Sequence, residues 1–175
     1  MTKLLSAAVV TLLACTLTAC GSDDDATASK NISASILKSQ KSSSGAAQFL
    51  ALRKKDADCI GDGLVDEVGT DKLQKYGVLT KDMATKQSVT EVRMSGADAA
   101  SATDVLFSCS DIEKMMRTAV AKSGSIPRAM QSCVDKALDE DNLRPMFTKV
   151  FEGKQGEAQK ALTTPLTRCA TGSAG

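Results

Sequence analysis

The segments "CIGDGLVDE" (59–67) and "CVDKALDED" (133–141) decide the fold of this chain, because they are two copies of one pattern. Each reads cysteine, a β-branched aliphatic residue, two further residues, a small residue, leucine and then acids. Two later segments, "ATDVLFSC" (102–109) and "LTTPLTRC" (162–169), both end in a cysteine with leucine three residues before it. The chain therefore contains two related units, each of which opens near one cysteine and closes on another.

Apolar residues around these units recur at the three- and four-residue spacing of an amphipathic helix. The clearest stripes are Ile112, Met115, Met116, Ala119 and Val120; Ile126, Met130, Val134, Ala137 and Leu138; and Leu143, Met146, Phe147, Val150 and Phe151. The expected N-caps of these three helices are Ser110 (with Glu113 as a capping box), Ser125 and Asp141. No segment alternates strongly enough to predict a strand, and "QSVTEVRM" (87–94) is expected to be a loop or an extended segment.

These patterns predict an all-α, disulfide-stapled bundle of about six or seven helices, built from two related Cys-helix-helix-Cys units. The helical domain is expected over residues 47–175, with the units at about 53–109 and 126–169. The first unit is about 14 residues longer between its cysteines, and the extra residues are expected within 79–96.

The N-terminal segment has the features of an export signal. Lys3 is followed by an apolar run from Leu4 to Leu17, which at 14 residues is shorter than the roughly 20 that a membrane-spanning helix needs. The run ends in "LTAC" (17–20), which resembles the lipobox of bacterial lipoproteins. The resemblance implies that residues 1–19 are a signal peptide and that Cys20 is acylated. An ordinary cleaved signal with an incidental cysteine is the alternative.

If Cys20 is acylated, the protein is expected at the cell membrane, lipid-anchored on the extracytoplasmic side. Residues 21–46 are rich in Ser, Ala, Asp and Lys, and such a composition buries little apolar surface. We therefore expect residues 20–46 to form a flexible tether behind the lipidated cysteine. The combination of lipobox, Ser-rich segment and paired helices with four cysteines is similar to small surface lipoproteins of actinobacteria, a resemblance that implies no particular activity.

Four cysteines follow Cys20, and an even number in an exported chain indicates two disulfides. They are Cys59, Cys109, Cys133 and Cys169. Because a duplicated unit would close its own bridge, the repeat favours Cys59–Cys109 and Cys133–Cys169, although four cysteines allow three pairings. Each cysteine falls on or beside an apolar stripe, which predicts buried bridges. No C-x-x-C motif occurs, so we expect structural rather than redox-active disulfides.

The composition excludes several functional classes. The net charge of +1 provides no electrostatic basis for binding nucleic acid. Aromatic residues make up only 3% of the chain, so interfaces that depend on aromatic anchors are not expected. Histidine is absent, which removes Ser-His-Asp and Cys-His catalysis and the commonest zinc ligand. We expect no cofactor and no metal.

Three weaker motifs remain. Ser35 and Lys38 match the S-x-x-K pattern of Ser-Lys hydrolases, but the companion elements are absent. The acids in "LDEDN" (138–142) lack the spacing and the glycine of a calcium loop, so a helix cap is the better interpretation. The methionines on the apolar faces are expected in the core, with a groove for a lipid or partner helix as the alternative; they are Met115, Met116, Met130 and Met146.

The sequence thus predicts a membrane-anchored, non-enzymatic lipoprotein that serves as an interaction or envelope-structural module. Its partners would be the membrane, through the lipid on Cys20, and a protein partner or apolar ligand that the sequence does not identify. A small apolar-ligand or lipid-binding lipoprotein is the alternative, and it predicts an enclosed apolar cavity between the helices. A Ser-Lys hydrolase is a third hypothesis.

Overall fold

The computed structural model describes residues 23–41, 52–122 and 126–170 of the chain. The described residues form eight helices and, apart from one isolated bridge between Leu79 and Thr85, no β-structure. The helices are α1 (Asp23–Lys41), α2 (Lys54–Glu67), α3 (Thr70–Lys75), α4 (Gly96–Cys109), α5 (Ile112–Lys122), α6 (Arg128–Ala137), α7 (Glu140–Phe151) and α8 (Gln155–Ala170). The prediction of an all-α, disulfide-stapled bundle is confirmed, and the eight helices of the described residues exceed the upper end of the expected six or seven by one.

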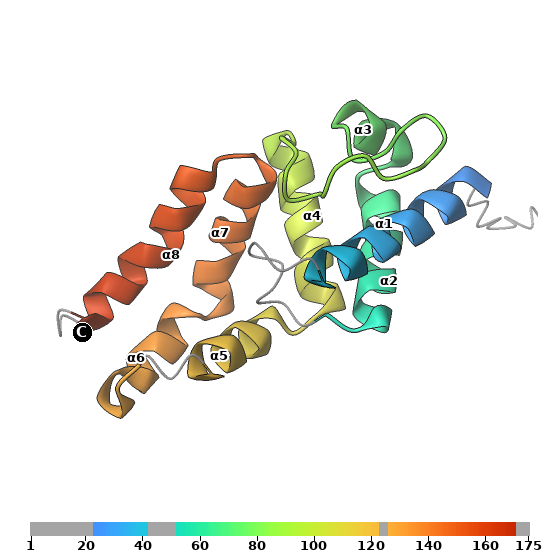
Figure 1. Cartoon of the computed structure of the whole chain (residues 1–175). Coiled ribbons are helices and arrows are strands. Elements are labelled where there is room, and N and C mark those ends of the chain that lie inside the picture. The colour runs from blue at the N-terminus through green and yellow to red at the C-terminus, as the bar shows by residue number, and fades with distance from the viewer. Residues whose placement is uncertain (1–22, 42–51, 123–125, 171–175) are drawn as a thin grey trace, which may run out of the picture.

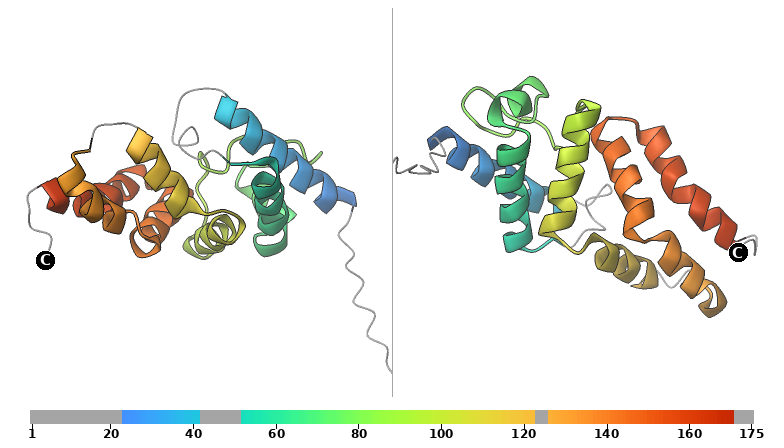
Figure 2. Two further views of the ribbon diagram at one scale, coloured as in Figure 1. Left: turned by 90° about the horizontal axis from the view of Figure 1, so that it is seen from below. Right: turned by 180° about the vertical axis from the view of Figure 1, so that it is seen from behind.

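The main helices pack side by side in a row, and several of the packed pairs are not neighbours in the sequence. Helix α1 packs on α2, α2 on α4, α4 on α7 and α7 on α8, while α6 packs on α8 (Figure 1). One continuous apolar core runs along this row, from Ala28 and Ile32 of α1 to Ala158 and Cys169 of α8. Helices α1 and α8 therefore lie at opposite ends of the molecule (Figure 2).

The additional helix corrects the prediction of a flexible tether over residues 20–46. Residues 23–41 of that segment form α1, and only residues 20–22 and 42–46 lie outside the described residues. Ala28 and Ile32 are buried, with exposed fractions of 0% and 1%. The low average hydrophobicity of the segment concealed a narrow apolar stripe, because a helix needs only one buried face to pack against a neighbour.

The two cysteine-bounded units share the order of their helices. The first consists of α2, α3 and α4, and the second of α6, α7 and α8. Positions that match in the repeated sequence also match in burial: Ile60 and Leu64 of α2 are buried, as are Val134 and Leu138 of the α6 segment. The repeat inferred from the sequence is therefore a repeat of core positions.

The extra residues of the first unit form the long loop between α3 and α4. This loop, residues 76–95, buries its own apolar side chains, among them Val78, Leu79 and Val92. In the second unit the corresponding connection between α7 and α8 is only residues 152–154. The Met94 amide at the end of the long loop donates to the Phe151 carbonyl at 2.9 Å, which joins the two units.

Two of the expected helix starts lie elsewhere. At α5 the cap is Asp111, whose carboxylate accepts the Lys114 amide at 3.0 Å, whereas the Ser110 hydroxyl donates back to the Leu106 carbonyl at 2.7 Å. Ser110 therefore completes the last turn of α4, and the predicted capping box with Glu113 is wrong. The two helices follow each other so closely that only Ser110 lies between Cys109, the last residue of α4, and Asp111, the cap of α5.

At α7 the cap is Asp139 rather than Asp141, because the Asp139 carboxylate accepts the Asn142 amide at 3.1 Å. The helix begins two residues earlier than expected, and Pro145 therefore lies inside it, in the second turn. The third expected cap, Ser125, lies outside the described residues.

Candidate functional site

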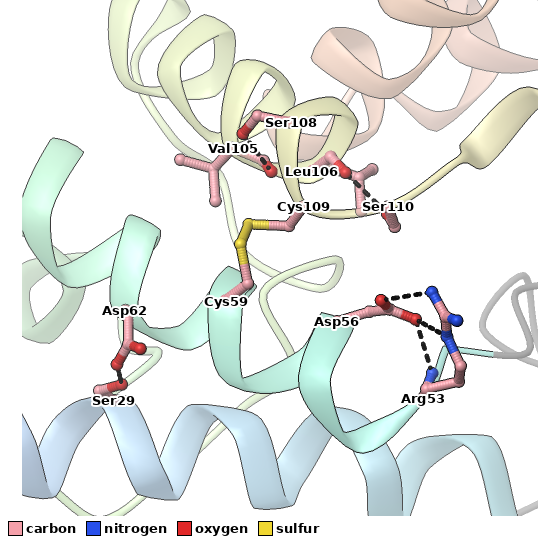
Figure 3. Close-up of a disulfide and its surroundings, with 10 residues drawn as sticks. All are labelled: Ser29, Arg53, Asp56, Cys59, Asp62, Val105, Leu106, Ser108, Cys109 and Ser110. Carbon is pink, nitrogen blue, oxygen red and sulfur yellow. Dashed lines mark hydrogen bonds and ion pairs between the residues drawn. A yellow bond between two sulfur atoms is a disulfide. The ribbon is translucent and has the colours of Figure 1, made fainter.

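The two disulfides pair the cysteines within each unit, as the repeat predicted. Cys59 of α2 is bonded to Cys109 of α4, with 5.5 Å between their Cα atoms (Figure 3), and Cys133 of α6 is bonded to Cys169 of α8, with 5.6 Å. Both Cα separations are ordinary for protein disulfides. In each unit the bridge ties the first helix to the last, so it closes the unit that the repeat defines.

The bridges differ in their access to solvent. Cys169 is buried, with 7% of its surface exposed, and Cys133 is half-buried. Cys59 is exposed and Cys109 is half-buried, so the expectation of a buried bridge is wrong for the first unit. The reason is position on the helix: Cys59 lies beside the apolar stripe of α2, at the edge where that helix meets solvent.

The seam between α1 and α2 is made of small and polar residues. Ala57 and Gly61 of α2 let the backbone of α1 come close, and Ala57 is fully buried. Along the edge of the seam the Ser33 hydroxyl donates to the Asp58 carboxylate at 2.6 Å, and one turn away the Ser29 hydroxyl donates to Asp62 (Figure 3). The two pairs show that α1 and α2 run antiparallel. Serines that suggested a solvated tether are instead the contacts that hold α1 in place.

The best-connected polar cluster of the described residues surrounds Asp98, in the first turn of α4. Its carboxylate accepts the Lys72 ammonium at 2.8 Å, the Tyr76 hydroxyl at 2.5 Å and the Ser95 hydroxyl at 2.8 Å. The Ser95 amide donates to the Tyr76 hydroxyl at 3.2 Å. The Lys72 hydrogen bond, followed by that of Tyr76, lowers the pKa of Asp98 to about 2.

The Asp98 cluster has the geometry of a structural clamp. It joins α3, the end of the long loop and the start of α4, and Ser95 is also the N-cap of α4, where its hydroxyl accepts the Asp98 amide at 3.2 Å. Both carboxylate oxygens are occupied by donors from the protein itself. A general base needs a carboxylate with a pKa near the working pH, and that of Asp98 is shifted away from it.

A groove lies between α5 and α6. It has a volume of about 410 Å³ and adjoins a second hollow of about 580 Å³, with which it shares Arg117, Gln131 and Asp135. Its apolar side is formed by Val120, Ala121, Ile126 and Val134. None of the four methionines proposed as an adaptable surface lines it; Met146 is buried in the core, and Met115, Met116 and Met130 pack against that core.

The candidate Ser-Lys pair does not have the environment that the chemistry needs. Ser35 and Lys38 lie three residues apart on α1, where Ser35 is half-buried and Lys38 is exposed. A lysine acts as a general base when burial depresses its pKa, and an exposed ammonium is not desolvated. The described residues include no hydrogen bond between these two side chains.

The acidic run at 138–142 serves as a helix start, as the sequence indicated. The Asp139 carboxylate receives both the amide and the side chain of Asn142, at 3.1 and 2.8 Å, and the Glu140 side chain pairs with Arg144. Among the described residues no group of three or more His, Cys, Asp or Glu side chains is placed to hold a metal ion.

A second cluster that the sequence does not predict, besides that of Asp98, lies at the boundary between the units. The Arg144 guanidinium of α7 pairs with Asp104 of α4 and lies 4.7 Å from the centre of the Phe107 ring. Phe107 in turn meets Phe147 edge to face, with 5.9 Å between the ring centres. The only signal in the sequence is that Asp104 and Phe107 share a helix face three residues apart, and their partner could not be found without the fold.

No protein-family model, curated protein or solved structure matches this chain. In the described part of the chain, no helix is both long enough and apolar enough to cross a membrane.

Proposed function

We propose that this chain is an extracytoplasmic lipoprotein, anchored to the cell membrane by a lipid on Cys20, that acts as a non-enzymatic interaction or envelope-structural module. The observation that carries the proposal is that all four cysteines in the described residues are paired in two disulfides. Such bridges persist in oxidising compartments outside the cytoplasm. The apolar run that ends in "LTAC" at residues 17–20 supplies the route of export and the site of attachment.

The polar geometry supports the non-enzymatic part of the proposal. Asp98 is the carboxylate whose pKa is most strongly lowered, and both of its oxygens accept hydrogen bonds from the protein itself. In the Ser35–Lys38 pair the lysine is exposed, which does not suit a general base. A small domain that is cross-linked by two disulfides and by ion-paired polar clusters is suited to presenting a rigid surface. The groove between α5 and α6 is the surface feature that a partner would use.

The test of the anchor is mass spectrometry of the protein extracted from its native membrane without reduction. We expect an acylated N-terminal peptide that begins at Cys20, together with the cross-linked peptides of both bridges. Cys20→Ser should release the protein from the membrane fraction, whereas the matched variant Cys15→Ser, within the signal, should leave it there. An unmodified Cys20 in membrane-extracted protein would refute the anchor.

Binding of a small apolar ligand is the second candidate, and the observation that favours it is the α5–α6 groove, which is partly open to solvent rather than the enclosed cavity expected from the sequence. Half of its lining is apolar, and its volume of about 410 Å³ lies in the range of small-molecule sites. Replacing Val134 is unsuitable as a test because that residue is buried in the core. Ala121→Trp, at an exposed position of the lining, should abolish binding of a fluorescent fatty acid if the groove is the site, whereas Ala129→Trp, exposed on α6 outside the lining, should not.

A further inference from the structure

The anchor and the first helix are separated by very little chain. Cys20 is followed by only Gly21 and Ser22 before α1 begins at Asp23. An extended residue spans at most about 3.6 Å, so the start of α1 lies within roughly 11 Å of the lipidated residue. A long flexible tether would let the domain stand far from the membrane, whereas so short a link keeps the first turn of α1 near the membrane surface.

Helix α1 is fixed to the body of the domain, so its orientation is that of the domain. Its buried face, which includes Ala28 and Ile32, packs on α2, and the two serine–aspartate pairs hold the edge of the seam. On the other side of α1 the Asn31 side chain donates to the Met83 carbonyl of the long loop at 2.8 Å. Whatever face of α1 the membrane meets therefore determines which end of the molecule points away from it.

The face of α1 opposite the buried one is an uninterrupted exposed row. It consists of Asp23, Thr27, Lys30, Ala34, Lys38 and Lys41, all of which are exposed. At 100° per residue these six positions fall within roughly 80° of the helix circumference. We call these six residues the outer row of α1. Beyond the first turn its only charges are three lysines, and the described residues contain no ion pair to any of them.

We propose that the outer row of α1 contacts the anionic lipid headgroups of the membrane in which the Cys20 acyl chains are inserted. The inference rests on the proposed lipidation of Cys20. One acyl chain binds a bilayer only marginally, and basic residues near the surface add to the hold on anionic lipid. Asp23 and the exposed Asp24, in the first turn of α1 nearest the anchor, oppose this attraction; within the outer row the three lysines outnumber the single aspartate. Helix α8 lies at the opposite end of the molecule from α1, so it then faces away from the membrane (Figure 2).

The chain contains no tryptophan, which allows a direct test. A single tryptophan is introduced by Ala34→Trp in the outer row or by Thr164→Trp at an exposed position of α8. The lipidated full-length proteins are reconstituted in phosphatidylcholine vesicles with and without phosphatidylglycerol, doped with a dansyl-headgroup lipid as energy acceptor. We expect several-fold greater energy transfer from Ala34→Trp than from Thr164→Trp when phosphatidylglycerol is present.

The role of the lysine charges is tested with a matched pair of triple variants. Changing Lys30, Lys38 and Lys41 together to Glu should remove the excess transfer from Ala34→Trp on phosphatidylglycerol vesicles. The same triple change at Lys114, Lys136 and Lys160, which are exposed on α5, α6 and α8, alters the net charge equally and should leave that transfer unchanged.

The outcomes separate this inference from the proposed function. The orientation would be overturned, and the anchor left intact, if Cys20 is acylated but the two tryptophan variants show equal energy transfer. The same holds if Cys20 is acylated and both triple lysine variants lose the same amount of energy transfer. An unmodified Cys20, established by the mass of the reconstituted protein, would overturn both.

Discussion

Gly61 of α2 faces the backbone of Ser29 of α1 so closely that a Cβ atom at Gly61 would lie 2.5 Å from the Ser29 carbonyl oxygen. The atom that it would meet belongs to the backbone of a helix, so it cannot move aside as a flexible side chain would. The close approach is possible because Ala57, one turn earlier on α2, is also small. This contact makes α1 a part of the packed domain.

Gly61→Ala should therefore destabilise the protein by about 1 to 3 kcal/mol, because the added methyl group forces α1 and α2 apart. The measurement is urea unfolding of the chain followed by circular dichroism. Gly156→Ala is the matched control: a Cβ atom there would meet nothing within 4 Å, and alanine favours the helix by up to about 1 kcal/mol. Equal stability of the two variants would show that α1 and α2 can separate at their seam without cost.

Ile32→Ala tests the same helix through its core face. Ile32 is 1% exposed, and removing a buried isoleucine side chain costs about 2 to 5 kcal/mol. Lys30→Ala, two residues earlier on the exposed face, should change the free energy of unfolding by less than about 0.5 kcal/mol. If residues 23–41 were an independent tether, both variants would unfold like the wild type, and that outcome would contradict the fold.

More of the fold could be predicted from the sequence than of the polar clusters and the groove on its surface. The pairing of the cysteines followed from local repeats, because Ile60 and Val134, or Leu64 and Leu138, occupy matching core positions in the two units. Helix α1 was missed because composition was averaged over the whole segment. The signals were present, since the three aspartates at 23–25 and the two lysines Lys38 and Lys41 place charges where the helix dipole favours them.

The polar clusters could not be predicted in the same way. Asp98 meets Lys72 across 26 residues, and Arg144 meets Asp104 across 40. Neither spacing corresponds to a helix turn or a local motif, so only the packing of distant elements brings these side chains together. The groove between α5 and α6 is likewise lined by side chains of two helices, and the periodicity within each helix does not predict how the two are placed.

The Asp98 cluster predicts a loss of stability in acid. The pKa of Asp98 is lowered from 3.8 to about 2 in the folded protein, so the unfolded chain takes up the proton first as the pH falls. The stabilisation is complete above about pH 4 and is lost as the pH falls to about 2, and it amounts to about 2 kcal/mol. The free energy of unfolding, measured by urea titration between these pH values, should fall accordingly.

Asp98→Asn should remove this part of the pH dependence and lower the stability at neutral pH by about 1.5 to 3 kcal/mol, because the ion pair with Lys72 is lost. The difference between variant and wild type should shrink as the pH approaches 2. Asp66→Asn, at an exposed position of α2, should change the free energy of unfolding at neutral pH by less than about 0.5 kcal/mol. A profile for Asp98→Asn that stays parallel to that of the wild type would contradict the role of the cluster.

The unequal exposure of the two bridges predicts the order in which they are reduced. Thiol–disulfide exchange needs access of the attacking thiolate to a sulfur, and Cys59 is exposed whereas Cys169 is 7% exposed. Under native conditions a limiting amount of dithiothreitol should open Cys59–Cys109 before Cys133–Cys169, as followed by alkylation of the freed thiols and peptide mass spectrometry. In denaturing urea the difference in access disappears, and the two bridges should be reduced at similar rates. Faster reduction of Cys133–Cys169 in the folded protein would mean that the second unit opens more readily than the first, and that local opening rather than static exposure governs the reaction.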